Sequence, residues 1–210
     1  MLTLHLIRHG ETGWNRERRI QGQRESELND TGREQARALR QQVRDLELTS
    51  IHVSSAVRTR QTARLLTELV DLEPQYRDDL REISLGDWET RLWSEVEDEY
   101  PEQAGHFHRE PHRFNFDGAE NFADLQKRGV SAIEDIASKE VEGNVLVVSH
   151  GALLKTVLLH YAGVNLAYLW DGPSLHNCSH SILSTASGAG LQLVSIAGVQ
   201  ADEIQWPDQT

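Results

Sequence analysis

The stretch LTLHLIRHG at residues 2–10 decides the fold class, together with VLVVSHG at residues 145–151. Each stretch begins as a short apolar run, typical of a buried strand, and ends in a histidine followed by a glycine. Glycine lets the chain turn sharply while the imidazole stays at the edge of the sheet. Because such runs alternate with helical patterns, we expect an α/β protein of three layers, α/β/α, with a mostly parallel central sheet.

Apolar spacing and capping residues locate the other elements. Asn29, Asp30 and Thr31 precede one helical pattern, and Pro101 closes another. The expected strands are residues 2–7, 51–53 and 145–148, with a last hairpin of residues 179–186 and 190–197 across Gly188 and Gly190. The expected helices are residues 32–46, 57–70, 91–100, 121–138 and 151–162, and residues 105–118, rich in His, Arg, Phe and Pro, are expected to be irregular.

The chain has 210 residues, a formal net charge of −12 and one cysteine, Cys178. An acidic excess of this size argues against a protein that neutralises nucleic-acid phosphates or an anionic membrane. The most apolar stretch, residues 145–164, contains His150 and Lys155 and is a poor membrane span. A lone cysteine forms no internal disulfide, which fits a reducing compartment. We therefore expect a cytoplasmic protein without nucleic-acid or membrane partners.

No repeat, low-complexity tract or linker divides the chain. We expect a single domain over residues 1–210 with a lid-like excursion near residues 91–120, and a homodimer is left open as its assembly. His106, His108 and His112 lie in this excursion, beside arginines that would repel a cation. A lid or a solvated loop is therefore a better interpretation of this segment than a metal site.

Basic side chains follow three of the expected strands. The first strand ends at Arg8 and His9, the strand at 145–148 leads to His150, and Arg58 lies in the first helical turn after residues 51–53. Sites in open α/β sheets form at such strand ends, often beside helix N-termini that favour anions.

This group of side chains suits phosphoryl transfer. Two guanidinium groups match phosphate oxygens, while one imidazole acts as nucleophile and the other holds charge. The sequence contains no acidic magnesium motif and no glycine-rich phosphate loop with a lysine. It therefore predicts transfer through a phosphohistidine, with no metal and no other cofactor.

Four blocks of the sequence, in this order, strengthen that prediction: LIRHGETGWN (6–15), SSAVRTRQTA (54–63), LREISLGDWE (80–89) and VLVVSHG (145–151). Together they resemble the motifs of the histidine phosphatase superfamily, also called phosphoglycerate mutase-like. IQG at 20–22 and LHNCS at 175–179 extend the resemblance. The chain departs from the usual pattern at Thr90, where glycine is common, and at AEN (119–121), where Gly-Glu-Ser is more usual.

The resemblance implies a phosphoglycerate mutase-like fold and a role for each matching residue. His9 would be the residue that is phosphorylated, and Arg8, Arg58 and His150 would hold the phosphoryl oxygens. Glu82 would protonate the leaving group and then activate water. The phosphate-binding residues would be Asn15, Gln21, Gly22 and Gly151.

Some of these assignments have plain alternatives. Glu82 lies in the charge-rich run RDDLRE, where a solvated surface carboxylate is the ordinary expectation. Asn15 could simply cap a turn. The arginines at 16, 18, 19 and 24 are either exposed charges or groups that steer anions toward the site.

Three functions fit the sequence. The first is a phosphatase acting on a small phosphorylated metabolite, such as a phosphoglycerate, phosphoserine, a sugar phosphate or a cobalamin-pathway phosphate ester. The second is a bisphosphoglycerate-dependent mutase, but the resemblance implies that mutases have an extra segment for which the interval from Glu82 to His150 is too short. The third is a non-catalytic phosphate-binding regulator, which the intact set of five core residues argues against. We therefore expect a metal-independent phosphomonoesterase.

Overall fold

The computed structural model of the chain describes residues 1–140, 142–185 and 190–207. Within them, seven strands form one sheet in the order β3-β2-β4-β1-β5-β6-β7. The strands β3, β2, β4 and β1 are parallel to one another, whereas β5 pairs antiparallel with β1, β6 with β5 and β7 with β6. The strands are β1 (Leu2–Arg8), β2 (Leu48–Ser54), β3 (Gln75–Arg77), β4 (Gly143–Ser149), β5 (His180–Thr185), β6 (Leu191–Ile196) and β7 (Val199–Gln200).

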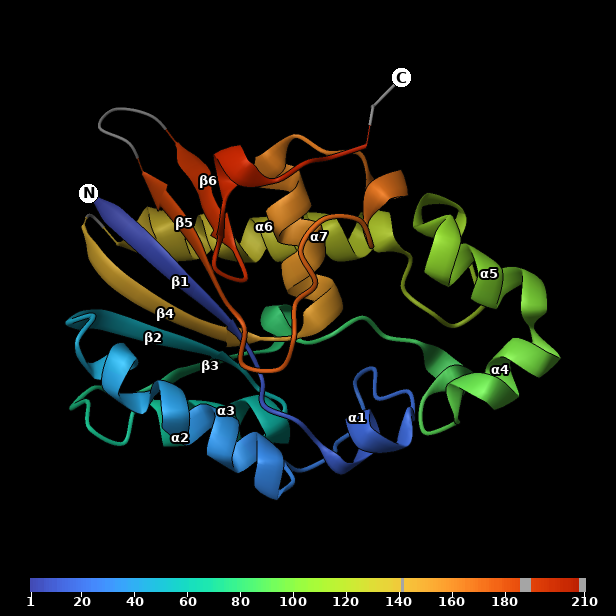
Figure 1. Ribbon diagram of the computed structural model, residues 1–210, viewed down its shortest axis with the longest axis horizontal. Coiled ribbons are helices and arrows are strands. Elements are labelled where there is room, and N and C mark those ends of the chain that lie inside the picture. Colours follow the sequence, from blue (N-terminus) through green and yellow to red (C-terminus); the bar gives the residue numbers. More distant parts are fainter. Residues whose placement is uncertain (141, 186–189, 208–210) are drawn as a thin grey trace.

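Helices cover both faces of the sheet (Figure 1). On one face α2 (Asp30–Arg44) packs with α3 (Val57–Leu66), and on the other α6 (Phe122–Lys139) packs with α7 (Gly151–Ala162). The side chains of β4 alternate between the two cores, since Val145 and Val147 join one cluster while Leu146 and Val148 join the other. The α/β prediction is thus confirmed, and the sheet is mixed, with a parallel half and an antiparallel half.

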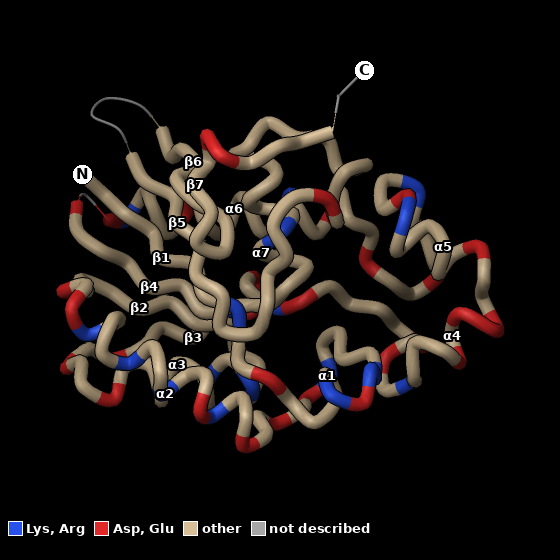
Figure 2. The backbone as a smooth tube through the Cα atoms, viewed as in Figure 1, with Lys and Arg blue, Asp and Glu red and all other residues tan. Residues whose placement is uncertain are grey.

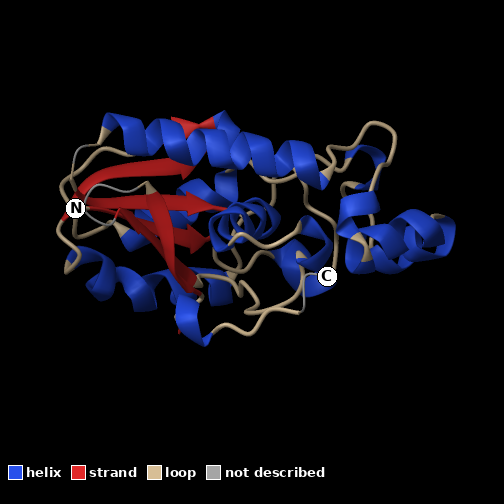
Figure 3. Cartoon of the chain, turned by 90° about the horizontal axis from the view of Figure 1, so that it is seen from above, coloured by secondary structure: helices blue, strands red, loops and turns tan. Residues whose placement is uncertain are grey.

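Two further helices, α4 (Trp93–Glu99) and α5 (Pro101–Arg109), extend beyond one end of the sheet (Figures 1 and 3). The expectation that residues 105–118 are irregular is wrong in its first part, which is helical. Pro101 does not only close α4, because it also occupies the first turn of α5, where its missing N–H costs no hydrogen bond. Trp88 is fully buried among the aromatic rings of this region, including Phe107 and Phe114, and this packing fixes the excursion on the body of the protein.

Other boundaries differ by a few residues. Capping by Asn29, which accepts a hydrogen bond from the backbone N–H of Gly32, starts α2 two residues earlier than expected. The helix α3 ends at Leu66, although apolar spacing continued to Val70. The sequence patterns missed the short helix α1 (Gly13–Glu17) and the three-residue strand β3. The expected turn of the last hairpin, including Gly188, lies outside the described residues.

Charged residues are distributed over the helical surface. Figure 2 shows acidic residues along α2, α4 and α5, with basic residues among them. In the part of the chain that the structure describes, no helix is both long and apolar enough to cross a membrane.

Candidate active site

The strands β1 and β4 bring two histidines together. They pair in parallel with Arg8 opposite Ser149, so His9 and His150 each lie one residue beyond the same edge of the sheet. The backbone N–H of His9 donates to the carbonyl of Ser149 at 3.0 Å, and the two imidazole ring centroids are 5.3 Å apart. β2 ends beside β4, and α3 then carries Arg58 to the same edge. The strand ends therefore meet as the sequence predicts.

The hydrogen bond of His9 fixes which ring nitrogen is available. Its Nδ1 lies 2.8 Å from the carbonyl oxygen of Gly10. A carbonyl only accepts, so Nδ1 carries the hydrogen and Nε2 keeps a lone pair. Burial lowers the pKa of His9 well below its usual range, and the positive charges of Arg58 and Arg8 lower it further. The ring is thus a neutral imidazole with Nε2 as its nucleophilic atom.

His150 is held from the opposite side of its ring. Its Nε2 is hydrogen-bonded to the hydroxyl of Ser54 at 2.7 Å, and both side chains are fully buried. Burial also lowers the pKa of His150 well below its usual range, with Arg58 as the second cause. Its Nδ1 is buried and has no hydrogen-bond partner among the described residues.

Two buried arginines complete the group. Arg58 donates from Nη2 to the carbonyl of Gly22 at 2.7 Å and from Nη1 to the carbonyl of Arg24 at 2.9 Å. Arg8 donates from Nη1 to the carbonyl of Leu175. Burial lowers the pKa of Arg58 to about 10, which leaves it positively charged at neutral pH. The Nε atoms of both arginines are buried and lack a partner in the described structure.

Buried polar groups in proteins are nearly always hydrogen-bonded. Here three of them, Arg8 Nε, Arg58 Nε and His150 Nδ1, lack a partner among the described residues, and the charges of Arg8 and Arg58 act on both buried histidines. The two guanidinium N–H groups beside a neutral imidazole form a cradle for an anion with several oxygens, and Nδ1 of His150 donates to it in the tautomer whose Nε2 accepts from Ser54.

Glu82 lies after a 3₁₀ turn, Asp78–Leu80, and faces the N-terminus of α7. Its Oε2 accepts from the backbone N–H of Ala152 at 3.1 Å, and its Oε1 accepts from the N–H of Leu153 at 3.0 Å. The N–H of Ile83 also donates to Oε1 at 3.0 Å. The carboxyl group is therefore fixed by a helix end, a place that favours negative charge, and it is not a solvated surface group.

The predicted phosphate-binding residues lie around one pocket of about 320 Å³. Gly22 adopts a φ of +50°, which favours glycine, and presents its carbonyl to Arg58. Arg8 lies directly behind the lining, since a Cβ at position 151 would come within 3.2 Å of its Nε, and the ring of His150 lies 5.3 Å from that of His9 between centroids. The predicted residues in the lining itself are His9, Asn15, Gln21, Gly22, Arg58, Glu82 and Gly151.

Asn15 also has a capping role, the alternative that its sequence position offered. Its Oδ1 accepts from the backbone N–H and from the hydroxyl of Thr12, both at 3.1 Å, in a capping box at the start of α1. Asn177 donates to the same oxygen at 3.4 Å and to the carbonyl of His9 at 3.0 Å. With Oδ1 occupied in this way, the amide nitrogen is the group that Asn15 can offer to a ligand.

The outer part of the pocket was not predicted. It is lined by Trp93, Phe107 and Trp170, and a further basic residue, Lys155, faces it from α7. The Nζ of Lys155 donates to two backbone carbonyls of residues 171 and 173, both at 2.7 Å, and burial lowers its pKa to about 8. The aromatic residues of the 91–120 excursion were a signal for this wall, whereas position 170 had none.

The histidines of the excursion do not meet at a point where they could bind a cation. The ring of His108 packs on Trp93 at 4.6 Å between centroids, and its Nε2 lies 3.5 Å from Glu97. Among the described residues, no group of three or more His, Cys, Asp or Glu side chains is arranged to hold a metal ion.

Residues 4–196 match the model of the histidine phosphatase superfamily (branch 1). The chain belongs to this superfamily. Phosphoserine phosphatase 1 of Hydrogenobacter thermophilus is 32% identical over 183 residues, 87% of this chain and 86% of that protein. A probable phosphoglycerate mutase GpmB of Enterobacter is 34% identical over 181 residues, 86% of this chain and 84% of that protein. The structure of Bacillus stearothermophilus YhfR is 34% identical and superposes with a TM-score of 0.91, covering 96% of this chain and 99% of that one.

These similarities confirm three predictions from the sequence: the superfamily, the phosphoglycerate mutase-like α/β fold and the activity of a histidine phosphatase on a small phosphorylated metabolite.

Proposed function

We propose that this histidine phosphatase hydrolyses phosphomonoesters by transferring the phosphoryl group first to Nε2 of His9 and then to water. One observation carries the proposal: the bond from Nδ1 to Gly10 leaves Nε2 as the nucleophile within a set of buried donors. Arg8, Arg58 and His150 supply those donors and stabilise the negative charge on the phosphoryl oxygens. Asn15, Gln21, Gly22 and the backbone at Gly151 border the same space and bind the phosphate.

Glu82 moves the protons in this scheme. As the P–N bond to His9 forms and the P–O bond of the ester breaks, the leaving oxygen takes a proton from Glu82. The carboxylate that results accepts the N–H groups of Ala152 and Leu153, which stabilise it. In the second step Glu82 takes a proton from water, the water oxygen bonds to phosphorus, and the P–N bond breaks to release phosphate and neutral His9.

The pocket outside the phosphate site favours an alcohol with an aromatic or apolar part. Trp93 and Trp170 flank Phe107 with ring centroids at 4.8 and 5.7 Å, and Trp170 donates from its indole to the carbonyl of Phe107. Ile83 and Leu85 extend the apolar lining. Two cations in the lining are already engaged, Lys155 by backbone carbonyls and Arg19 by Glu17 and the carbonyl of Thr90, so they stabilise the segments that they contact. Such a wall binds rings by area and stacking.

A matched pair of esters tests this specificity. We expect 2-phenylethyl phosphate to have a kcat/KM about 10-fold or more above that of ethyl phosphate, because the leaving alkoxides are alike and only the aromatic contact differs. Trp93→Ala should remove most of that advantage and leave ethyl phosphate nearly unchanged. Phosphoserine, named for one relative, and 3-phosphoglycerate belong in the same panel. A clear preference for either over the aromatic ester would contradict the apolar assignment.

The mutase alternative keeps one observation in its favour, the similarity to a protein named probable phosphoglycerate mutase. Incubation with 3-phosphoglycerate and a trace of the bisphosphate separates the two activities. We expect inorganic phosphate to exceed any 2-phosphoglycerate formed, whereas rapid isomerisation would favour the mutase.

The predictions of a lid, of the cellular location and of the assembly remain proposals. The excursion at 91–120 is proposed to act as a lid, supported by Trp93 and Phe107 in the pocket lining. A cytoplasmic location is supported by the lone buried Cys178. A homodimer stays open as the assembly of this chain.

A further inference from the structure

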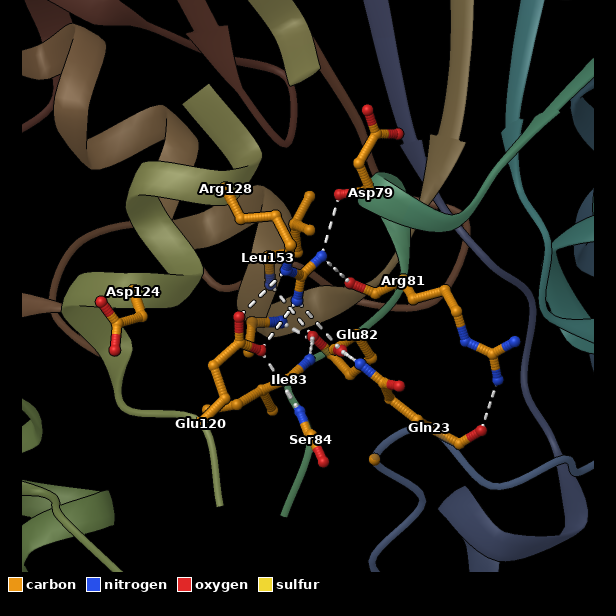
Figure 4. Close-up of polar contacts among 12 residues, drawn as sticks. Gln23, Asp79, Arg81, Glu82, Ile83, Ser84, Glu120, Asp124, Arg128 and Leu153 are labelled. Atoms are coloured by element: carbon orange, nitrogen blue, oxygen red, sulfur yellow. Dashed lines mark hydrogen bonds and ion pairs between the residues drawn. The ribbon is translucent and has the colours of Figure 1, made fainter. Parts of the chain in front are cut away.

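The segment that carries Glu82 lies outside the sheet and is held by one side chain of α6. Arg128 donates from Nη1 to the carbonyls of Asp79 and Arg81 at 2.9 and 2.8 Å, and from Nη2 to the carbonyl of Glu82 at 3.3 Å (Figure 4). Gln23 donates to the same Glu82 carbonyl at 3.1 Å. The backbone of the general acid is therefore fixed by side chains from two other parts of the fold.

Glu120 orients the guanidinium of Arg128. Its Oε1 accepts from Nε at 2.9 Å and its Oε2 accepts from Nη2 at 2.8 Å, a bidentate pair. The same carboxylate accepts from the backbone N–H of Ser84 at 3.3 Å, and the N–H of Glu120 donates to the carbonyl of Ser84 at 2.8 Å. Residues on both sides of Glu82 are thus tied to one ion pair, whose side chains are only 24% and 17% exposed.

The geometry uses every donor that an arginine has. A guanidinium carries five N–H groups in a plane, and Arg128 makes five hydrogen bonds, three to backbone carbonyls and two to Glu120. A lysine has three donors and no fixed plane, so it cannot reproduce this arrangement. The pattern is specific to one residue type, and Figure 4 shows it at the segment that carries Glu82.

We propose that the Arg128–Glu120 pair positions Glu82 for proton transfer to the leaving oxygen, a role that rests on the proposed function of Glu82 as general acid. The side chain of Glu82 reaches Ala152 and Leu153 from a backbone that has no strand partner in the sheet. Loss of the pair lets that backbone shift, and a misplacement of about 1 Å at a catalytic group can cost on the order of 100-fold in rate.

The test compares leaving groups. In single-turnover phosphorylation of His9, Arg128→Lys should slow an alkyl phosphate about 10- to 100-fold, and p-nitrophenyl phosphate, whose leaving group needs no proton, at most about 3-fold. Glu120→Gln, a milder change, should show the same selectivity with a smaller loss. Adding Arg128→Lys to Glu82→Gln should bring little further loss on the alkyl ester, because both act through one group.

Arg77→Gln is the matched control. Arg77 also forms a bidentate pair, with the side chain of Asp79, and also bonds to α6 through Asp135, with a side chain 16% exposed. Its side chain donates no hydrogen bond to the carbonyls of residues 81 and 82 in the described structure. We expect this variant to lose stability, measured as Tm, without selectivity between the two esters.

The outcomes separate the two proposals. If Glu82→Gln is selective for the alkyl ester but both Arg128→Lys and Glu120→Gln slow the two esters equally, the positioning role is wrong. If Glu82→Gln itself shows no selectivity, the general acid is misassigned and the positioning proposal falls with it. Selectivity in Glu82→Gln and in at least one of the pair variants, with none in Arg77→Gln, supports the positioning role.

Discussion

Two histidine pairs, all of whose members are buried except the half-buried His180, each have one member in β1 or directly beyond its end, and they differ in how their nitrogens are used. His9 and His150 have ring centroids 5.3 Å apart at the edge of the sheet, and His5 and His180 have centroids 5.1 Å apart between β1 and β5. Burial lowers the pKa of all four residues. Burial and proximity of two imidazoles are therefore common to both pairs and do not by themselves make a site.

Hydrogen bonding makes the difference. His5 Nε2 donates to Asn144 at 3.3 Å, so its Nδ1 accepts from Nε2 of His180 at 3.0 Å. His9 and His150 are not hydrogen-bonded to each other. Nδ1 of His9 bonds to Gly10 and Nε2 of His150 bonds to Ser54, so Nε2 of His9 and Nδ1 of His150 remain available. Arginine charges act on His9 and His150 and not on His5 and His180. A reactive pair here needs nitrogens that remain available and cations beside them.

The largest expected effect on activity comes from substituting His9, with the same substitution at His5 as its comparison. His9→Gln should lower kcat/KM with p-nitrophenyl phosphate by at least about 10⁴-fold, since the nucleophile is lost. His5→Gln removes a buried ring of the same strand and should change kcat/KM by no more than about 3-fold while lowering Tm. Comparable losses in the two variants would erase the distinction between the pairs.

A smaller effect is expected at Glu82, which contacts neither pair by a hydrogen bond. Glu82→Gln should slow an alkyl phosphate by about 10²- to 10⁴-fold, the usual range for positioned proton transfer. Phosphorylation by an aryl phosphate should suffer much less, because nitrophenolate leaves without a proton. Single-turnover rates with both esters measure the contrast, and equal losses would mean that Glu82 only binds phosphate or supports α7.

The paired histidines His5 and His180 should appear in the pH dependence of stability. Burial lowers the pKa of His180 to about 4 from 6.5, so below pH 6.5 the unfolded chain binds a proton that the folded chain does not. Stability is therefore complete above pH 6.5 and falls as the pH drops toward 4, by at most about 3 kcal/mol from this group. Urea unfolding at pH 7 and pH 5 should show a smaller loss for His180→Gln than for the unmodified chain. An identical loss in both would place the acid sensitivity elsewhere.

Removal of metal ions is expected to have no effect on activity. Because Arg8 and Arg58 supply the positive charge beside His9, exhaustive chelation should leave kcat/KM unchanged within error. A loss that magnesium or zinc restores would show that the arginines do not suffice.

The sequence predicted the central site better than its surroundings, for a physical reason. His9, Arg58 and His150 follow strand ends, and parallel strands bring such ends together whatever the loops do. The position of Glu82 depends on Arg128, a contact between residues 46 apart that no local pattern shows. The aromatic wall likewise needs Trp170 to meet α5, and the helix α5 itself was obscured by a run of His, Arg and Phe with little apolar spacing.

We predict that Nε2 of His9, and no other imidazole nitrogen, receives the phosphoryl group. The most direct measurement mixes enzyme with p-nitrophenyl phosphate, quenches in alkali within one turnover and locates the phosphoryl group by peptide mapping and ³¹P NMR. We predict an acid-labile phosphoramidate on Nε2 of His9, present in His5→Gln and absent in His9→Gln. A phosphoryl group on His150, on Nδ1 of His9, or on no histidine would contradict the account.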